Sequence, residues 1–328
     1  MYNGNVDFEQ GAVVIRTSET FLRFGHFELL AARNELDTLQ KLADFTIENY
    51  FPEIDKNSTK KYLDFFKKIG EKTADMIVEW LRVGFTHGVM NTDNMSICGE
   101  TIDYGPCAFM NTYLPETVFS SIDAGGRYAF GNQPNIAHWN LIRLAETLLA
   151  LIDESEEKAI TLATECLNAY PVKFFDNWLA GMRKKLGIFN EEAEDTKLAE
   201  DLLMYMQKNK ADYTNTFRLM ATEAIHTTAL YEDAGFRNWL TQWKARLTRQ
   251  IQTFDESIAL MNSVNPKVIP RNHLVEEAFS AAENGDMTVL NDLLAVLANP
   301  YADLNHPEKY TQAPDATFDK QYKTFCGT

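Results

Sequence analysis

Residues 87–106, HGVMNTDNMSICGETIDYGP, carry the most informative pattern in the chain. Within them, the short runs MSIC and TIDY are separated by Gly99 and Glu100, which suit a two-residue type II′ turn. We therefore predict a β-hairpin here. Strands this short serve to position the residues at their ends, so the polar side chains flanking the hairpin, Asn94 and Asp103, are candidates for a functional site.

Asn94 and Asp103 have the chemistry of a divalent-metal site. Kinase-like phosphotransferases use a loop Asn and a strand-end Asp to hold Mg²⁺ on a triphosphate, and this cation prefers oxygen ligands. Asp93 is a neighbouring carboxylate that could accept a proton from an attacking hydroxyl or help hold the metal. The position two after His87, where kinases carry an Asp, is Val89, so the motif alone also fits a catalytically silent protein.

Each of these residues also has an ordinary structural interpretation. An adjacent Asp93-Asn94 pair often forms a turn, because both side chains bond local backbone amides. His87 lacks an HExxH context, so bonding to the loop backbone is favoured over metal binding. The scattered His138, His226 and His273 receive the same interpretation. The tryptophans lie in helical patterns and are predicted to pack in the core or in grooves; they are Trp80, Trp139, Trp178, Trp239 and Trp243.

The remaining sequence is predicted to be mainly helical. Residues 11–27, GAVVIRTSETFLRFGHF, are rich in β-branched and aromatic residues and predict one or two short strands. Helical patterns follow to Gly84, with Ala74 and Ile77 on one apolar face. The stretch from Gly105 to Pro134 is predicted to be a long ordered loop.

Helical periodicity dominates from Asn135 onward, and the tail after Pro300 is expected to be irregular. Acidic stretches at 153–158 and 191–195 are expected in solvated helix starts and loops. The segments predicted as helices are IAHWNLIRLAETLLALI and residues 191–208, 212–219, 236–261 and 274–297.

Composition limits the partners. Asp and Glu outnumber Lys and Arg by 47 to 31, giving a formal net charge of −16, which disfavours nucleic acid and anionic membrane surfaces. A nucleotide stays possible because a divalent ion can bridge carboxylates to phosphates. The four cysteines form no CxxC spacing, and neither a signal segment nor an 18-residue apolar run is visible. We expect a cytoplasmic protein.

Four groups of motifs together resemble the selenoprotein O family of protein adenylyltransferases. They are GAVVIR…LRFGHFE, HGVMNTDN…TIDYGP, GRYAFGNQPNIAHWNLIRLAETL and NPKVIPRNHL…AENGD…LLAVLANPY, and they extend over nearly the whole chain. The resemblance implies a kinase-like fold that binds ATP in a reversed orientation. It also implies a reaction dependent on Mg²⁺ or Mn²⁺, in which AMP is transferred to Ser, Thr or Tyr hydroxyls of proteins.

The same resemblance assigns roles to five residues. Asp93 is expected to be the proton acceptor, and Asn94 and Asp103 the metal ligands, with Asp103 also near the nucleotide. Arg16 and Arg23 are expected to contact the ATP phosphates, for which the planar guanidinium is suited. Without the resemblance, Arg16 and Arg23 would be ordinary strand-face or salt-bridge arginines.

Two departures from the family pattern accompany this assignment. The family's Gly-rich phosphate loop and its Lys lie upstream of the segment that resembles residues 11–27, and the chain contains neither GxGxxG nor GxxxxGK[ST]. A redox pair in the family would join a C-terminal Cys to a second Cys. Cys326 fits the first position, but Phe119 occupies the second, so we expect no intramolecular disulfide at Cys326.

We therefore predict a mainly α fold with a small β component, the C-terminal lobe of a protein-kinase-like fold whose N-lobe is largely absent. Residues 1–27 would be remnant strands at the lobe junction, 28–300 the helical lobe and 301–328 an irregular tail. The expected activity is protein adenylylation, with little or no transfer by the isolated chain. Two alternatives stay open: a catalytically silent helical binding module, and a protein kinase that breaks a different phosphorus–oxygen bond.

Overall fold

The computed structural model describes residues 13–304 and 306–325, and over these residues the chain is mostly helical with one small two-stranded sheet. The predicted mainly α composition is confirmed, and the kinase-like architecture stays a prediction. The elements are α1 (Phe24–Ala32), α2 (Leu36–Tyr50), α3 (Lys61–Val83), β1 (Phe85–Thr86), η1 (Thr92–Asn94), β2 (Ala108–Phe109), η2 (Phe130–Asn132), α4 (Gln133–Ile152), α5 (Glu156–Lys185), α6 (Asp195–Lys208), α7 (Tyr213–Met220), η3 (Glu223–Thr227), α8 (Ala229–Glu232), α9 (Ala234–Leu247), α10 (Phe254–Val264), α11 (Asn272–Glu283), α12 (Thr288–Leu297), η4 (Glu308–Tyr310) and α13 (Ala316–Gln321).

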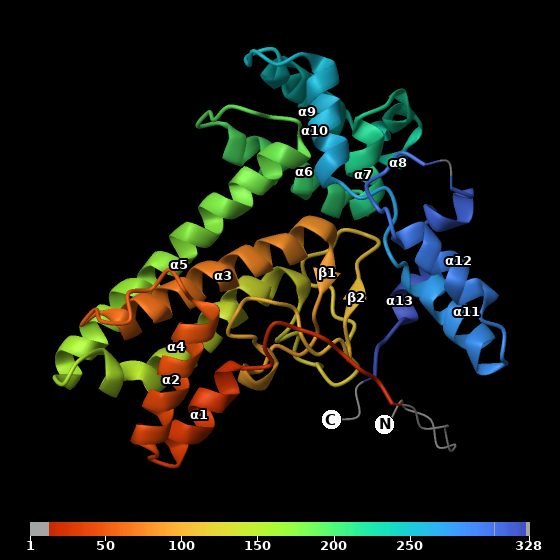
Figure 1. Ribbon diagram of the computed structural model, residues 1–328. Coiled ribbons are helices and arrows are strands. Elements are labelled where there is room, and N and C mark those ends of the chain that lie inside the picture. The colour runs from red at the N-terminus through yellow and green to blue at the C-terminus, as the bar shows by residue number, and fades with distance from the viewer. Residues whose placement is uncertain (1–12, 305, 326–328) are drawn as a thin grey trace.

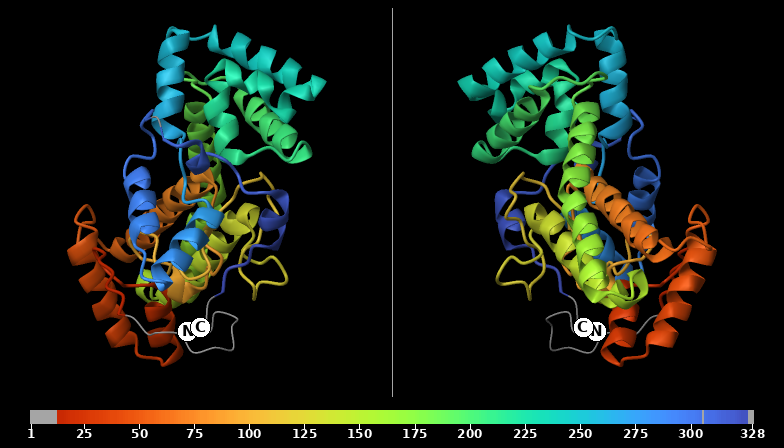
Figure 2. Two further views of the ribbon diagram at one scale, coloured as in Figure 1. Left: turned by 90° about the vertical axis from the view of Figure 1, so that its right-hand side faces the viewer. Right: turned by 90° about the vertical axis from the view of Figure 1, so that its left-hand side faces the viewer.

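Helices α3, α4 and α5 pack against one another and form the centre of the molecule (Figure 1). Helix α1 packs on α4 and α2, and these first two helices extend from the lower end of the centre. Helix α5 continues beyond this group to the helices α6–α10, which both side views in Figure 2 show at the opposite end. The small sheet lies at the end of α3, next to the centre.

Helix α3 ends where the sequence predicts. Gly84 adopts φ 77° and donates its N–H to the carbonyl of Leu81, a left-handed cap that favours glycine. The predicted apolar face is confirmed, because Ala74, Ile77 and Trp80 are buried. The cap turns the chain directly into β1, so the end of α3 fixes where the following loop begins.

The predicted strands in residues 11–27 are wrong over the described part of that segment. Residues 13–22 form no strand, and α1 begins at Phe24. Val13 and Ile15 are 91% and 86% exposed, so these β-forming residues do not pack against an apolar surface of the protein. Phe24 and Phe27 are fully buried three positions apart, which is the spacing of a helix face. Residues 11 and 12 lie outside the described residues.

Two predicted long helices are each divided in two. The predicted helix 236–261 is α9 followed by α10, and Thr253 caps α10 through a reciprocal pair of bonds with Glu256. The predicted helix 274–297 is broken between α11 and α12 at Gly285, which adopts φ 83°. Both breaks carry local sequence signals, a T-x-x-E capping box and an Asn-Gly pair, that periodicity alone does not detect.

Helix α5 was not delimited by the sequence, and it contains a proline. Pro171 has no N–H for the carbonyl of Leu167, one turn earlier. The Nε2 atom of His138 lies 3.1 Å from that carbonyl and replaces the missing donor, while its ring stacks on Tyr170. The predicted structural role of His138 is confirmed, and α5 can continue through the proline.

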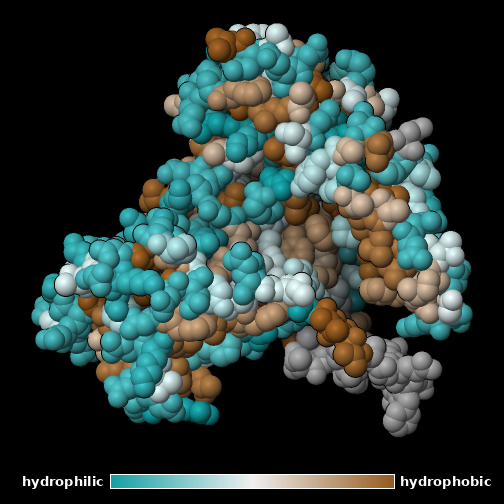
Figure 3. All heavy atoms as spheres, in the orientation of Figure 1, coloured by the Kyte–Doolittle hydropathy of each residue, from teal (hydrophilic) through white to brown (hydrophobic). Residues whose placement is uncertain are grey.

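Helices α11 and α12 form a hairpin with a small core of its own. Figure 3 shows apolar side chains on the face of this pair that is turned toward the viewer. Phe279 of α11 and Leu294 of α12 are exposed. The tail after Pro300 is mostly irregular, as predicted, with η4 and α13 as short exceptions. Among the described helices, none combines the length and the apolar character needed to cross a membrane.

Candidate functional site

Residues 87–107 form a loop whose two ends are joined by the small sheet. Strand β1 pairs antiparallel with β2, so the chain leaves and returns at the same place. All three residues predicted to act on the metal and the proton, Asp93, Asn94 and Asp103, lie on this loop. The pairing of β1 with β2 therefore positions Asn94 and Asp103, a role that the sequence analysis gave to a hairpin within the loop.

The predicted hairpin of MSIC with TIDY is wrong. The Phe24 N–H donates to the Met95 carbonyl and the Ile97 N–H donates to the Leu22 carbonyl, each at 3.0 Å. The chain instead turns at Ile97 and Cys98, where the Gly99 N–H donates to the Ser96 carbonyl at 3.3 Å, so residues 95–98 do not form an extended strand that could pair with residues 101–104. The close contact between residues 22–24 and this loop was not visible in the sequence.

His87 connects the two halves of the loop. Its ring is fully buried and stacked on Trp80, with centroids 5.1 Å apart. Its Nε2 lies 2.8 Å from the Ile102 carbonyl and its Nδ1 lies 3.4 Å from the Val89 amide nitrogen. A neutral ring protonated on Nε2 satisfies both bonds. The predicted role of His87, bonding the loop backbone, is confirmed.

Asp93 and Asn94 lie in the short helix η1, in different environments. Asn94 is 7% exposed and donates its Nδ2 to the Val89 carbonyl at 3.1 Å, which turns its Oδ1 away as the available ligand atom. Asp93 is exposed. A Cβ added to Gly25 would lie 3.2 Å from the Asp93 Cα, so glycine allows the start of α1 to approach η1 closely.

Asp103 has a strained backbone. Its φ of 58° is in the left-handed region, which costs a non-glycine residue roughly 1 kcal/mol, although Asp tolerates it better than most residues. Its Oδ1 accepts the Gly105 N–H at 3.4 Å, and the carbonyl just before it is the one held by His87. Strain of this kind gathers at functional sites, which motivates a functional hypothesis for Asp103.

The two predicted phosphate-binding arginines also lie beside this loop. Arg16 is exposed, and its guanidinium carbon is 5.6 Å from the ring centroid of Tyr104, the residue after Asp103. Arg23 forms an isolated antiparallel bridge with Ser96. Its Nε is buried and bonds to no group of the described residues. A buried cationic donor without a protein partner is suited to an anionic ligand.

The oxygen atoms of Asn94 and Asp103 are suited to a Mg²⁺-type ion that also binds water and substrate phosphates. They are less suited to a metal held by protein ligands alone. Within residues 13–304 and 306–325, no three His, Cys, Asp or Glu side chains gather as metal ligands. Mg²⁺ usually takes one or two protein oxygens together with water and substrate phosphates. An amide oxygen and a carboxylate on the two halves of one tied loop match that kind of site.

Two residues that fix the loop were missed in the sequence, and both are on α4. Gln133 accepts the His87 N–H at 2.9 Å and donates to the Phe85 carbonyl at 3.0 Å. Asn140 donates to the Met90 carbonyl at 2.8 Å. Both are fully buried, but in sequence they resemble ordinary polar positions of an amphipathic helix, so no local signal identified them.

We expect His87 to make stability pH-dependent. Burial lowers the pKa of His87, against an opposing effect of the hydrogen bond to Ile102. The unfolded chain then binds the proton first, so the free energy of unfolding should fall as pH drops below about 6.5, toward the lower folded pKa. Denaturant titrations at pH 7.5 and 5.5 measure this loss. A His87→Gln variant should lose less stability across that interval, and equal losses in both proteins would contradict the assignment.

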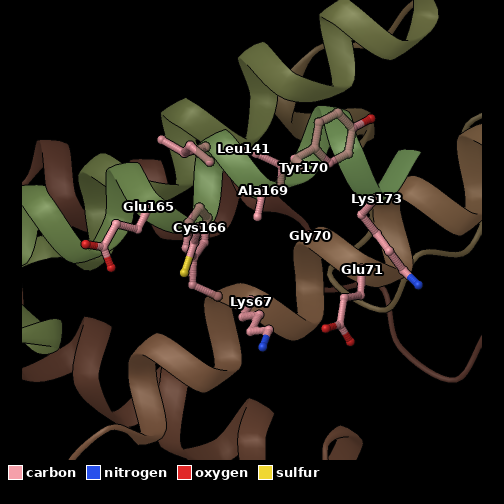
Figure 4. Close-up of a pocket in the computed structure, with 11 residues that line it drawn as sticks. Lys67, Gly70, Glu71, Leu141, Glu165, Cys166, Ala169, Tyr170 and Lys173 are labelled. Atoms are coloured by element: carbon pink, nitrogen blue, oxygen red, sulfur yellow. The ribbon is translucent and has the colours of Figure 1, made fainter. Parts of the chain in front are cut away.

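A cavity of about 370 Å³ lies between α3 and α5 (Figure 4). Figure 4 shows Cys166 and Tyr170 of α5 across from Lys67 and Gly70 of α3. None of its lining residues belongs to the loop 87–107. Gly70 leaves part of this space open, because an added Cβ would meet no heavy atom within 4 Å.

Gly70→Ala should therefore stabilise the protein. Alanine in a helix interior is better than glycine by about 1 kcal/mol, and nothing here opposes the methyl group. Thermal or denaturant unfolding would measure the gain. Gly84→Ala is the matched control and should destabilise, because Gly84 needs positive φ and its added Cβ would lie 3.1 Å from Tyr213. A loss of stability in Gly70→Ala would show that the cavity is filled in solution.

The C-terminal segment lies against residues 106–121. The Thr324 N–H donates to the Phe119 carbonyl at 2.8 Å, and the Thr324 hydroxyl donates to the Pro106 carbonyl at 2.7 Å. Phe119 packs edge-on against Tyr322. Cys326 lies outside the described residues, so the expectation of no disulfide there stays a prediction.

Comparisons with known proteins point in one direction. A family model described as "Protein adenylyltransferase SelO" matches residues 3–298. Relatives named protein nucleotidyltransferase YdiU include those of Pelagibacter ubique (strain HTCC1062), Bacillus thuringiensis subsp. konkukian (strain 97-27) and Shouchella clausii (strain KSM-K16), which are 49%, 47% and 49% identical over 319 residues. The match covers 97% of this chain and 66%, 65% and 65% of the relatives, so the chain spans just under two thirds of their length.

Proposed function

The chain belongs to the family of the protein adenylyltransferase SelO, and on that premise we propose that it transfers AMP from ATP to hydroxyl groups of proteins. The observation that carries the proposal is the loop tied by His87. One side of this loop presents Asp93 and the Asn94 oxygen, and the other presents Asp103. Two hard oxygen ligands and an exposed carboxylate on one loop suit chemistry on a metal-bound triphosphate.

The proposed reaction is a nucleotidyl transfer. The oxygen of a Ser, Thr or Tyr hydroxyl attacks the α-phosphorus of ATP, the bond from this phosphorus to the oxygen bridging the β-phosphate breaks, and pyrophosphate leaves. Asp93 accepts the hydroxyl proton. Arg16 and Arg23 bind phosphate oxygens through charge-assisted hydrogen bonds. Asn94 and Asp103 would hold a divalent cation, which supplies charge neutralisation at the phosphates when bound.

Two preparations of ATP test the reaction, one labelled at the α-phosphate and the other at the γ-phosphate. Incubation with the 328-residue chain and a mixture of proteins should place only a low level of label on protein hydroxyls, and that label should be the α label. Transfer of the γ label alone would make the protein a kinase. Transfer of neither label, under conditions in which the chain binds ATP, would favour a silent binding module.

Asp103→Asn tests the metal assignment without requiring turnover. The change keeps the size of the side chain and removes its charge, so Mn²⁺ affinity in the presence of ATP should fall at least about ten-fold. Electron paramagnetic resonance measures free Mn²⁺ directly. Asp37→Asn, on the exposed start of α2, is the control and should match the parent. Equal Mn²⁺ affinity in Asp103→Asn and the parent would remove Asp103 from the site.

A further inference from the structure

Arg127, Trp139 and Arg143 form a surface group, in which Arg127 and Trp139 are exposed and Arg143 is half-buried, and we call it the arginine–tryptophan cluster. The guanidinium carbon of Arg127 lies 4.6 Å from the Trp139 ring centroid, and that of Arg143 lies 5.8 Å from the same centroid. Trp139 is not in the core, one of the two places predicted for it, because it is 38% exposed. Two cationic groups are thus gathered on one accessible indole of α4.

The cluster lies next to the loop that carries Asp93. Asn140, adjacent to Trp139, donates to the Met90 carbonyl, and Tyr128, adjacent to Arg127, donates its hydroxyl to Asn91. Met90 and Asn91 directly precede η1. Asn91 is two residues and Met90 three residues before Asp93, which are spans of at most about 7 and 11 Å of chain, so both anchors of the cluster are close to the proposed proton acceptor.

The backbone under Arg127 is fixed. Its N–H and that of Tyr128 each donate to the Asp123 carboxylate at 2.8 Å, and its carbonyl accepts a hydrogen bond from Asn132 at 2.7 Å. Its guanidinium also lies over the Tyr128 ring. An exposed arginine held on both sides of its peptide unit is positioned before any partner arrives, which lowers the entropy lost on binding.

Charge defines what the cluster can bind. Arg143 forms an ion pair with Glu146 on the same helix, whereas Arg127 forms none with the described residues. An accessible guanidinium without a carboxylate partner can bind a carboxylate through two parallel N–H bonds. This positive position stands out on a chain whose formal net charge is −16.

We propose that the arginine–tryptophan cluster binds an acidic side chain of the acceptor protein, close to the hydroxyl that receives AMP. This inference rests on the proposed function and names its substrate class: hydroxyl residues with Asp or Glu nearby in the acceptor. Arg127 makes the ion pair, and the Trp139 ring holds its guanidinium in place. Arg16 and Arg23 are assigned to the ATP phosphates, which leaves the cluster available to bind the acceptor protein.

Binding of labelled peptides tests this proposal without any transfer. Each fluorescein peptide carries one Tyr flanked by Glu, by Gln or by Lys, and anisotropy gives its affinity at low and high salt. The parent should prefer the Glu peptide over the Gln peptide by about five-fold at low salt, and less at high salt. Arg127→Ala should abolish the preference, and Arg127→Glu should shift it to the Lys peptide. Arg237→Ala is the matched control, because Arg237 is an exposed arginine on α9 that lies over the ring of Tyr231. This variant should keep the preference for the Glu peptide.

The outcomes separate this proposal from the proposed function. A charge preference that depends on Arg127, without transfer of the α label, would support the cluster and remove the adenylylation reaction. Transfer of the α label by a chain that binds all three peptides equally would overturn the cluster instead. A drop in ATP affinity in Arg127→Ala would assign Arg127 to the nucleotide, and tighter Arg127-dependent binding of a single-stranded oligonucleotide would assign it to nucleic acid. Either result would also overturn the proposal.

Discussion

Asp93→Asn is expected to reduce AMP transfer by about 10²–10⁴-fold, the usual contribution of a general base. Asn keeps the shape of the side chain but cannot accept the hydroxyl proton. Asp93 is exposed on η1, where an incoming hydroxyl can reach it, whereas Asn94 beside it is buried and offers only its oxygen. Transfer of the α label per unit time measures the effect.

The Asp93 variant should keep its affinity for ATP and Mn²⁺, which separates its role from that of Asp103. Asp37→Asn on α2 should transfer AMP at the parent rate. If Asp93→Asn transferred AMP within two-fold of the parent, another group would be the proton acceptor. If it lost Mn²⁺ affinity as Asp103→Asn does, Asp93 would act mainly as a metal ligand.

Asp195→Ala should lower the free energy of unfolding by about 3–5 kcal/mol, the loss typical when one partner of a buried ion pair is removed. The Asp195 side chain is 1% exposed, and it accepts bonds from the Nε atoms of Arg246 at 2.7 Å and Arg183 at 2.8 Å. These arginines come from α9 and α5, so the variant removes the one buried carboxylate from two largely buried guanidinium groups, which keep only the more exposed Glu192 and Glu191 as ion-pair partners. Denaturant unfolding measures the loss.

A matched surface change on the same helix provides the control. Asp201 pairs with Lys197 one turn away on α6, and the lysine side chain is largely exposed. Exposed pairs of this kind contribute about 0.3–0.5 kcal/mol, so Asp201→Ala should change the free energy of unfolding only slightly. Equal losses in the two variants would mean that the buried network adds nothing beyond a surface pair.

The Asp195 network should also depend on pH. Burial alone would raise the pKa of Asp195, but the bonds from Arg246, the Glu192 N–H and Arg183 outweigh it and lower the pKa. The stability from this group is therefore complete above the ordinary Asp pKa of about 3.9 and is lost as pH falls through the lower folded value. The network should be intact at neutral pH.

Most of the correct predictions from the sequence depend on residues that are close together in the chain. The end of α3 at Gly84, the helical segment now seen as α4 and the backbone role of His87 follow from spacing, caps and the absence of a metal-binding context. The motifs around Asn94 and Asp103 indicated the family that the comparisons support. The roles of these residues in chemistry stay predictions.

Long-range contacts were the part that the sequence could not supply. The acidic stretch at 191–195 was expected to be solvated, yet Asp195 is buried between arginines of α5 and α9. The predicted hairpin is absent because the chain turns at residues 97–98, while Met95 and Ile97 bond to residues 22–24, which are far away in the chain.

The sequence by itself determined the family, the mainly helical composition and the loop on which the candidate residues lie. Helix periodicity and caps depend on neighbours within a few positions, so they can be read locally. The tertiary structure alone decided that β1 pairs with β2, that Trp139 is exposed between Arg127 and Arg143, and that Asp195 is buried. A backbone or charged group bonds to whichever competing partner the folded chain brings closest, and that choice is made by packing among distant segments.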